Sequence, residues 1–239
     1  MKILCVSDQI DPLVYNQNAK NIFSDVDIIL CAGDLPMNYV DFIVTVFNKP
    51  VFFVFGNHDL KEFRFYHARK SLKYSYDTNH SHGGTHLGFT TYSSKNITYI
   101  DENGKETPLL IAGAGGSLKY NNGQNQYTDR QMKWKLIKMI PQLMINKRKY
   151  GRYLDILLTH ATPRHVHDHE DPCHKGFDCF NWFIKKFRPK YLVHGHIHLY
   201  DIREKRVSKV MDTTVVNAYA HYIINLPETQ ENETPEESL

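Results

Sequence analysis

The sequence contains little that points to a membrane, a nucleic acid or a cysteine-bound zinc ion. No apolar run approaches the roughly 20 residues that a transmembrane helix needs. A net charge of +3 is too small to indicate binding to an anionic membrane or to a nucleic acid. The four cysteines include no CxxC pair, which disfavours a structural cysteine–zinc site. The chemistry of the protein must therefore lie in its other polar groups.

The cysteines and the two chain ends indicate one domain in a reducing compartment. Cys5 and Cys31 lie in apolar runs, so we expect reduced, buried thiols and a cytoplasmic location. The opening residues, MKILCVSD, have too short an apolar run for a signal peptide and are typical of a first strand. The length suits one sizeable domain, assigned to residues 1–226. The acidic segment 227–239 is expected to be a disordered tail.

Short apolar runs alternate with helix-like segments along much of the chain, which indicates α/β architecture. The runs are rich in Ile, Val and Phe and have the length of buried strands: Ile3–Val6, Ile28–Cys31, Val51–Phe55, Ile156–Leu158 and Tyr191–Val193. Helices are predicted over 36–47, from a capping box at Thr128–Gln131, and over 176–187. Pro141 should kink or end the second of these helices.

The remaining strands are expected later in the chain. The pair Asn103-Gly104, between Ile97–Ile100 and Leu109–Ala112, predicts a β-hairpin. Further strands are predicted after the last helix, over Tyr200–Arg206, Val207–Met211, Thr213–Val216 and Tyr222–Leu226. We therefore expect a mixed sheet, or two sheets packed face to face.

Polar side chains follow five of the predicted strands, where open α/β sheets bind their ligands. They are carboxylate, amide and imidazole groups: Asp8, Asp34, Asn57, His160, His196 and His198. This mixture without thiolates suits Mn, Fe, Zn, Ni or Mg. Taken alone, Gly33-Asp34 is typical of a turn and His160 of a core histidine. Their repeated position after apolar strands instead predicts a metal site.

The ordered motifs SDQID, AGDL, GNHD, LLTHATP and VHGHIH resemble those of the calcineurin-like metallophosphoesterase superfamily, from Met1 to about Leu226. The resemblance implies a four-layer α/β/β/α sandwich of two mixed sheets flanked by helices. It also implies a centre of two divalent metal ions. The implied ligands are Asp34 bridging both ions, Asn57, His160 and His196 at one position, and Asp8 and His198 at the other.

The resemblance further implies hydrolysis of a phosphoester by a hydroxide that bridges the metal ions. His58 would stabilise the phosphoryl charge or protonate the leaving oxygen. Asp59 would orient His58, with a surface cap as the equal alternative. Lys119 and His174 are candidates for substrate binding, since they lie in the Gly-rich segment 113–128 and in the loop 160–178. Ordinary connecting loops are the alternative there.

One position departs from the family pattern of Asp-x-His. The sequence has Asp8-Gln9-Ile10, and isoleucine cannot bind a metal. Asp11 could take the place of the histidine, a water could fill the gap, or the position could be weak or empty. We favour a water or Asp11, with two metal ions still bound.

The same departure supports an alternative function. A retromer subunit of this superfamily keeps the fold as an interaction scaffold, so a non-catalytic scaffold is the second hypothesis. A nuclease is the third, motivated by basic residues that more often form a solvated helix face: Lys133, Lys135, Lys138, Lys147, Arg148, Lys149 and Arg152.

The leading hypothesis among these is hydrolysis of a small phosphorylated substrate. The segment GDLPMNYVD lacks the Asp-Arg of calcineurin-type protein phosphatases, which favours a phosphodiester or a nucleotide-like substrate. A membrane partner is not expected, nucleic acid is not favoured, and nothing indicates an oligomer.

Overall fold

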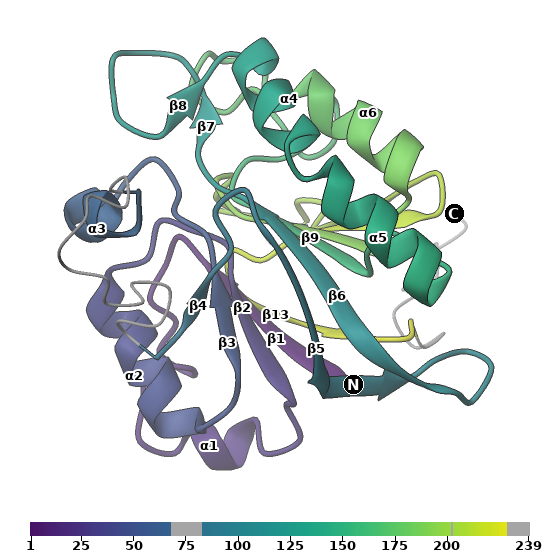
Figure 1. Cartoon of the computed structure of the whole chain (residues 1–239). Helices are drawn as coiled ribbons and strands as arrows, with labels where there is room; N and C mark the ends of the chain where they lie inside the picture. The colour runs from purple at the N-terminus through teal and green to yellow at the C-terminus, as the bar shows by residue number, and fades with distance from the viewer. Residues whose placement is uncertain (68–82, 202, 229–239) are drawn as a thin grey trace, which may run out of the picture.

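The fold consists of two β-sheets that lie face to face between helices (Figure 1). The computed structural model describes residues 1–67, 83–201 and 203–228. The acidic segment expected at the C-terminus lies almost entirely outside these described residues. Sheet A has the strand order β13 (Ala220–Asn225), β1 (Lys2–Ser7), β2 (Ile28–Cys31), β3 (Val51–Phe53), β4 (Thr85–His86). Sheet B has the order β11 (Val207–Val210), β12 (Thr213–Asn217), β10 (Tyr191–His194), β9 (Ile156–Thr159), β6 (Glu106–Ala114), β5 (Thr91–Ile100).

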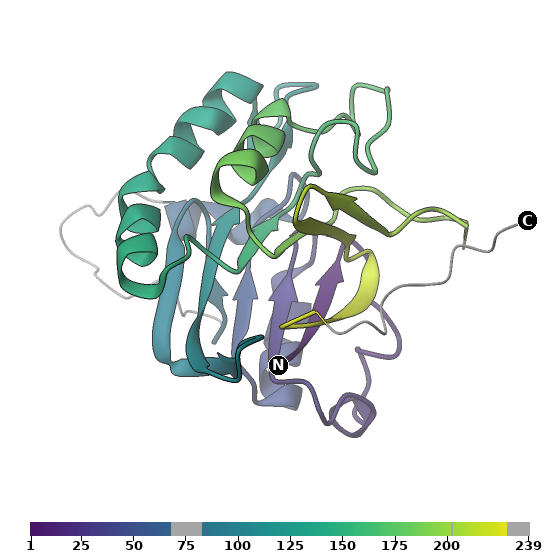
Figure 2. The same cartoon turned by 90° about the vertical axis from the view of Figure 1, so that its right-hand side faces the viewer.

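Helices cover the outer face of each sheet, which confirms the predicted four-layer sandwich (Figures 1 and 2). Beside sheet A lie α1 (Ala19–Ile22), α2 (Met37–Phe47), η1 (Leu60–Glu62) and α3 (Phe63–His67). Beside sheet B lie α4 (Asp129–Ile137), α5 (Ile140–Tyr150) and α6 (Asp178–Phe187). A small ribbon of β7 (Ser117–Leu118) and β8 (Gln126–Tyr127) precedes α4.

Alternating side chains of the strands fill three apolar layers, as expected for strands buried on both faces. On β1, Ile3 and Cys5 face the other sheet, whereas Leu4 and Val6 face α1 and α2. A third cluster lies between sheet B and α4–α6. Each helical layer and each sheet thus buries its apolar face against a neighbour, and the polar groups of the site are left to the strand ends.

Mixed pairing brings several strand ends to one edge of the sandwich. In sheet A, β1, β2 and β3 are parallel, and β13 runs antiparallel to β1. In sheet B, β6, β9, β10 and β12 are parallel. Figure 2 shows that the last strands, coloured yellow, contribute to both sheets. The carboxyl ends of β1, β2, β3, β9 and β10 therefore all lead into the candidate site.

The helix predicted from the capping box is divided in two. Thr128 accepts a hydrogen bond from Gln131 N, and the Gln131 side chain accepts one from Thr128 N, so the predicted capping box is confirmed. α4 ends at Ile137, and Pro141 lies in the first turn of α5. Proline suits that position because the first turn of a helix needs no intrahelical bond from its nitrogen. The predicted effect of Pro141 is thus confirmed as a helix end.

Two expectations about strands had different outcomes. The Asn103-Gly104 hairpin is confirmed, since β5 and β6 pair antiparallel and Gly104 has a φ of 74°. The strand predicted over Tyr200–Arg206 is wrong. Asp201 instead organises a turn, in which its carboxylate accepts a hydrogen bond from Arg203 N and its carbonyl accepts one from Glu204 N. Asp competes with extended structure in this way because its side chain satisfies nearby backbone donors.

Cys5 and Cys31 are free and buried in the core, as expected. Burial, helped by Cys31, holds the pKa of Cys5 well above its usual range, and burial raises the pKa of Cys31 to about 12. Among the helices of the described residues, none is long and apolar enough to cross a membrane.

Candidate metal centre

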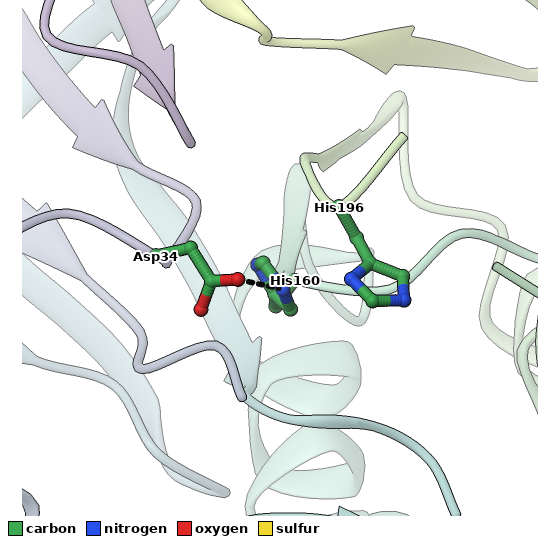
Figure 3. Close-up of side chains that lie close together, drawn as sticks. All are labelled: Asp34, His160 and His196. Carbon is green, nitrogen blue, oxygen red and sulfur yellow. Dashed lines mark ion pairs between the residues drawn. The ribbon is translucent and has the colours of Figure 1, made fainter. Parts of the chain in front are cut away.

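Three predicted ligands from both sheets meet at the common edge. Asp34 follows β2 of sheet A, while His160 and His196 follow β9 and β10 of sheet B. One ligand atom from each lies within 4.8 Å of those of the other two, and all three residues are buried. Figure 3 shows the Asp34 carboxylate and the two imidazoles gathered at one place. The structure thus brings together the core of the predicted site.

Asp34 is held in position by its backbone and by two neighbours. Its φ of 51° lies in the left-handed region, directly after Gly33 with a φ of 98°. One carboxylate oxygen accepts a hydrogen bond of 2.7 Å from His58 N, and the other lies 3.3 Å from His160 Nε2. Burial opposes ionisation of Asp34, but the His160 imidazole and the His58 N–H outweigh it and hold the pKa below its usual range. Asp34 is therefore an anion at neutral pH.

His160 is fully buried and presents Nε2 to the site. Its Nδ1 lies 2.8 Å from the carbonyl oxygen of Ala32, so Nδ1 carries the proton and donates it. Burial alone lowers the pKa of His160, but the adjacent Asp34 carboxylate outweighs burial and raises the pKa to about 9. With this pKa the imidazole also carries a proton on Nε2 at neutral pH. A cation beside Asp34 would replace the proton on Nε2, since a ligating imidazole must be neutral.

His196 is fixed in the complementary way. Its Nε2 lies 2.7 Å from the carbonyl oxygen of Cys173, which leaves Nδ1 free to bind a metal. Burial, followed by the nearby His160, lowers the pKa of His196 to about 4. A backbone carbonyl on the far nitrogen of a histidine is the usual support for a metal ligand. The two histidines therefore fit a divalent ion in tautomer as well as in position.

Asn57 extends this group with an amide oxygen. Its Oδ1 lies 3.2 Å from His160 Nε2, and its Nδ2 donates a hydrogen bond of 3.2 Å to the hydroxyl of Tyr120. The contact with Tyr120 orients the amide so that oxygen rather than nitrogen faces the ligands. Oxygen is the atom that binds a cation, so the orientation of Asn57 fits the predicted role.

The turn that carries Asn57 is built by close backbone contacts. A Cβ on Gly56 would lie 2.6 Å from Cε1 of His160 and would also collide with the Asp34 carboxylate. The amide of Asn125 donates to the carbonyl oxygens of Phe55 and Gly56, at 3.1 and 2.6 Å. Asn125 belongs to the Gly-rich segment 113–128, whose sequence did not predict this contact. That segment thus supports the end of β3.

Asp8 and His198 lie beside this group with different surroundings. The Asp8 carboxylate accepts hydrogen bonds from His196 N, at 2.9 and 3.0 Å, and from the Ser7 hydroxyl. His198 Nε2 lies 3.7 Å from Asp8, while its Nδ1 lies 2.9 Å from the hydroxyl of Tyr200. The nearby Asp8 raises the pKa of His198 against the effect of partial burial. Asp8 is therefore already engaged by protein donors.

Asp11, considered as a substitute for the missing histidine, is bound elsewhere. Its carboxylate lies 2.5 Å from His221 Nδ1 and accepts a hydrogen bond from Leu13 N. His221 is on β13, and its ring packs against Phe23 on the helical side of sheet A. Ile10 itself is 41% exposed. Nothing in these contacts brings Asp11 to the ligand group.

The remaining candidates lie outside the buried ligand group. His58 and Asp59 are exposed, and Asp59 precedes η1 without capping it through its side chain. Lys119 is exposed, next to Tyr120. His174 Nδ1 lies 3.0 Å from both carboxylate oxygens of Asp171, and its ring centroid is 5.6 Å from that of His196.

The fold and these donors define an α/β protein with a candidate centre for a divalent metal. The sequence profile of the calcineurin-like phosphoesterases matches residues 1–200. The chain therefore belongs to the calcineurin-like phosphoesterase family, whose members are generally metal-dependent hydrolases. Among curated proteins no match was significant.

Solved structures support the fold. The protein TT1561 of Thermus thermophilus has a TM-score of 0.60 and 14% sequence identity, over 95% of this chain and 94% of that one. An archaeal phosphodiesterase gives a TM-score of 0.44 at 15% identity, over 98% and 96% of the two chains. Vps29 from Entamoeba histolytica gives 0.35 at 14% identity, over 91% and 73%. The last two scores are too low to support a conclusion.

Proposed function

We propose that this protein is a metal-dependent phosphoesterase that hydrolyses a small phosphorylated substrate, foremost a phosphodiester or a nucleotide-like molecule. The observation that carries the proposal is the buried group of Asp34, His160 and His196, whose donor atoms lie within 4.8 Å of one another. Family membership gives the reaction class, and the tautomers of both histidines support metal binding at this place.

We infer two metal positions of unequal strength. The stronger one uses Asp34, Asn57, His160 and His196. The weaker one shares Asp34 and adds Asp8 and His198, where the family's additional histidine is replaced by Ile10 and a water completes the set. The contacts of Asp8 with His196 N and Ser7 support this order, because an ion there competes with existing hydrogen bonds. The donors suit Mn, Fe, Zn, Ni or Mg.

Divalent ions bound here would act as Lewis acids on a phosphoryl oxygen and activate a water for in-line attack. The chain itself would supply orientation and protons. His58 is anchored through its backbone N–H to Asp34, while its exposed imidazole is available to the phosphoryl group or the leaving oxygen. We keep Asp59 as the candidate that orients His58, and Lys119 and His174 as candidates for substrate binding.

The test is hydrolysis of bis-p-nitrophenyl phosphate by protein loaded with Mn²⁺ or Ni²⁺. We expect turnover that is abolished by a chelator and restored by adding the ion back. p-Nitrophenyl phosphate, assayed in parallel, separates a diesterase from a monoesterase. Absence of turnover with both substrates across Mn, Fe, Zn, Ni and Mg would refute the proposal.

An interaction scaffold is the second candidate, favoured by exposed apolar residues at and after the position of the missing ligand. Ile10 and Leu13 are 41% and 51% exposed. A scaffold should capture its partner equally well with His58→Ala, whereas Ile10→Asp should abolish capture.

The nuclease is the weakest candidate, because part of the basic run is engaged within the fold. Lys135 lies over the rings of Phe89 and Tyr127, and Arg152 is paired with Asp155 at 2.6 Å. A nuclease should bind DNA or RNA with strong salt dependence.

We further propose that residues 1–226 form one catalytic domain, followed by an acidic tail over 227–239. We also propose a cytoplasmic location, supported by the free, buried thiols of Cys5 and Cys31. Labelling of native protein by a thiol reagent only after unfolding would support reduced thiols. Recovery of a disulfide from the native protein would oppose both the reduced state and the location.

A further inference from the structure

A cavity of about 510 Å³ lies beside the metal centre and includes none of its candidate ligands. Its volume is in the range of small-molecule sites, about 300–1,000 Å³. One wall is formed by residues 165–169, and the others by Ile197, Leu199, Glu204, Lys205 and part of β11. The function proposed above does not use this space.

The cavity has both aliphatic and charged side chains in its lining. Val166, Leu199 and Val210 supply partly exposed aliphatic surface, and Ile197, which also lines the cavity, is fully buried. Such a lining favours the carbon skeleton of a ligand, since burying apolar surface is the main source of its affinity. The same cavity is also lined by Lys205 and Lys209, which are exposed.

The two acidic residues of the lining are already bound by the protein. Asp168 pairs with Arg164 at 2.5 Å and accepts a hydrogen bond from Gly176 N. The Glu204 carboxylate accepts hydrogen bonds from the backbone N–H groups of residues 200 and 201, at 3.2 Å each.

The lysines, in contrast, are little engaged. In the described part of the chain no ion pair involves Lys205, and Lys209 has one long contact of 3.8 Å with Glu228. Of the charged groups that line the cavity, the two ammonium groups are therefore the ones left available to a ligand.

The wall of residues 165–169 is held firmly in an uncommon conformation. His165 and His167 have φ values of 65° and 61°, in the left-handed region. His167 bridges two other residues, with its Nδ1 at 2.9 Å from His194 Nε2 and its Nε2 at 2.8 Å from the Ser208 hydroxyl. Burial, followed by the charge of Lys205, lowers the pKa of His167 to about 4, so the bridge is neutral. A wall fixed in this way is pre-organised for a ligand.

We propose that this cavity is a second ligand site, which binds a small organic anion with an apolar body. The aliphatic side chains contact the body of the ligand, and the ammonium groups of Lys205 and Lys209 bind its acidic group. The ligand is free in solution, because a volume of about 510 Å³ suits a small molecule.

The second site is separate from the metal centre but adjoins it. Ile197 lies between His196 and His198 in the chain. Hydrogen bonds also lead from the cavity residues Ser208 and His167 through His194 to the carbonyl oxygen of Gly195, one residue before His196. Binding in the cavity does not require the metal, so the proposal can be tested without any catalytic activity.

The probe for the test is 8-anilinonaphthalene-1-sulfonate, which joins an apolar ring system to an anion and gains fluorescence on burial. We expect saturable binding to one site of the full-length protein. The double variant Lys205→Glu, Lys209→Glu should bind the probe more weakly, with a dissociation constant raised by about tenfold or more. Lys20→Glu with Lys105→Glu makes the same change in net charge at exposed positions outside the cavity, and should change it by less than about twofold.

Two further measurements place the probe. Asp34→Asn should bind it with unchanged affinity, which separates this site from the proposed reaction. The amide resonances of Ser208 and Lys209 should shift on titration. Equal binding by both double variants, dependence of binding on Asp34, or absence of saturable binding would each overturn the proposal.

Discussion

The Asp34 carboxylate has one oxygen near His160 and another bound to His58 N. We expect Asp34→Asn to deplete both metal positions, because it removes the negative charge that they share. Metal content measured by mass spectrometry after gel filtration checks this. Asp212→Asn is the matched control, since Asp212 is exposed and pairs only with Arg188 among the contacts of the described residues. Full metal content in Asp34→Asn would refute the assignment.

His58 is expected to act in the reaction without binding the metal. His58→Ala removes the imidazole but keeps the backbone N–H that binds Asp34, so the metal should remain. The rate of phosphoester hydrolysis should fall by roughly 10²–10⁴, the usual contribution of a positioned proton donor. Metal content and turnover of the same preparation give both answers. Depletion of metal would show that His58 is a ligand, and an unchanged rate with full metal would remove it from the mechanism.

Side chains at strand ends could be predicted from the sequence, whereas their supports could not. Asp34, Asn57, His160 and His196 each follow an apolar run, which is a readable pattern. The carbonyls of Ala32 and Cys173, which fix the two histidine tautomers, carry no signal, because every residue has a carbonyl. These supports depend on how loops from distant parts of the chain meet.

At the scale of elements, the segment that forms β7 and β8 supports the end of β3 through the side-chain amide of Asn125 and the backbone N–H of Gly116. Asn125→Ala would leave the carbonyls of Phe55 and Gly56 without that donor. We expect a loss of about 1–3 kcal/mol in the free energy of unfolding, together with weaker metal binding. Urea titration and metal titration provide the two measurements. Asn122→Ala, in the same segment but exposed, should change neither. Loss of stability with unchanged metal affinity would mean that the ribbon only stabilises the fold.

Strongly apolar elements could be located from the sequence, but their ends and pairing could not. The central strands appear where continuous apolar runs predict them, since burial on both faces requires such runs. The region around Asp201 shows the limit. Its alternation of side chains is compatible with a strand, but local hydrogen bonds to Asp201 form a turn. Pairing of β13 with β1 joins the two ends of the described chain and has no local signature at all.

At the scale of the whole molecule, stability should fall on mild acidification. Burial, then Lys205, lowers the pKa of His167 to about 4, whereas an unfolded chain has a value near 6.5. Between these values the unfolded chain binds a proton that the native protein does not. The contribution of His167 to stability is therefore complete above about pH 6.5 and declines towards pH 4, by up to about 1.4 kcal/mol per pH unit.

Urea unfolding at pH 7, 6 and 5 measures this dependence. His167→Gln should reduce the slope with pH over that window, whereas His165→Gln, an exposed position on the same loop, should leave it unchanged. Equal slopes for His167→Gln and the unmodified protein would exclude His167 as the source.

Metal binding should stabilise the whole fold, because the ligands come from both sheets. An ion present at 100 times its dissociation constant should add about 2.7 kcal/mol to the free energy of unfolding. Thermal unfolding with Mn²⁺ and with a chelator measures this difference. Asp34→Asn should show no such difference. A gain of the same size in Asp34→Asn would indicate binding at another place.

The division of the ligands between the sheets also sets an order of events during synthesis. Asp34 and Asn57 leave the ribosome more than 100 residues before His160, and His196 follows later still. β1 acquires its outer neighbour β13 only after all four candidate ligands have emerged. A nascent chain thus has no complete centre until translation has passed His196, so its early folding must proceed without the ion. We therefore expect the proposed metal ion to be loaded only after His196 has been synthesised.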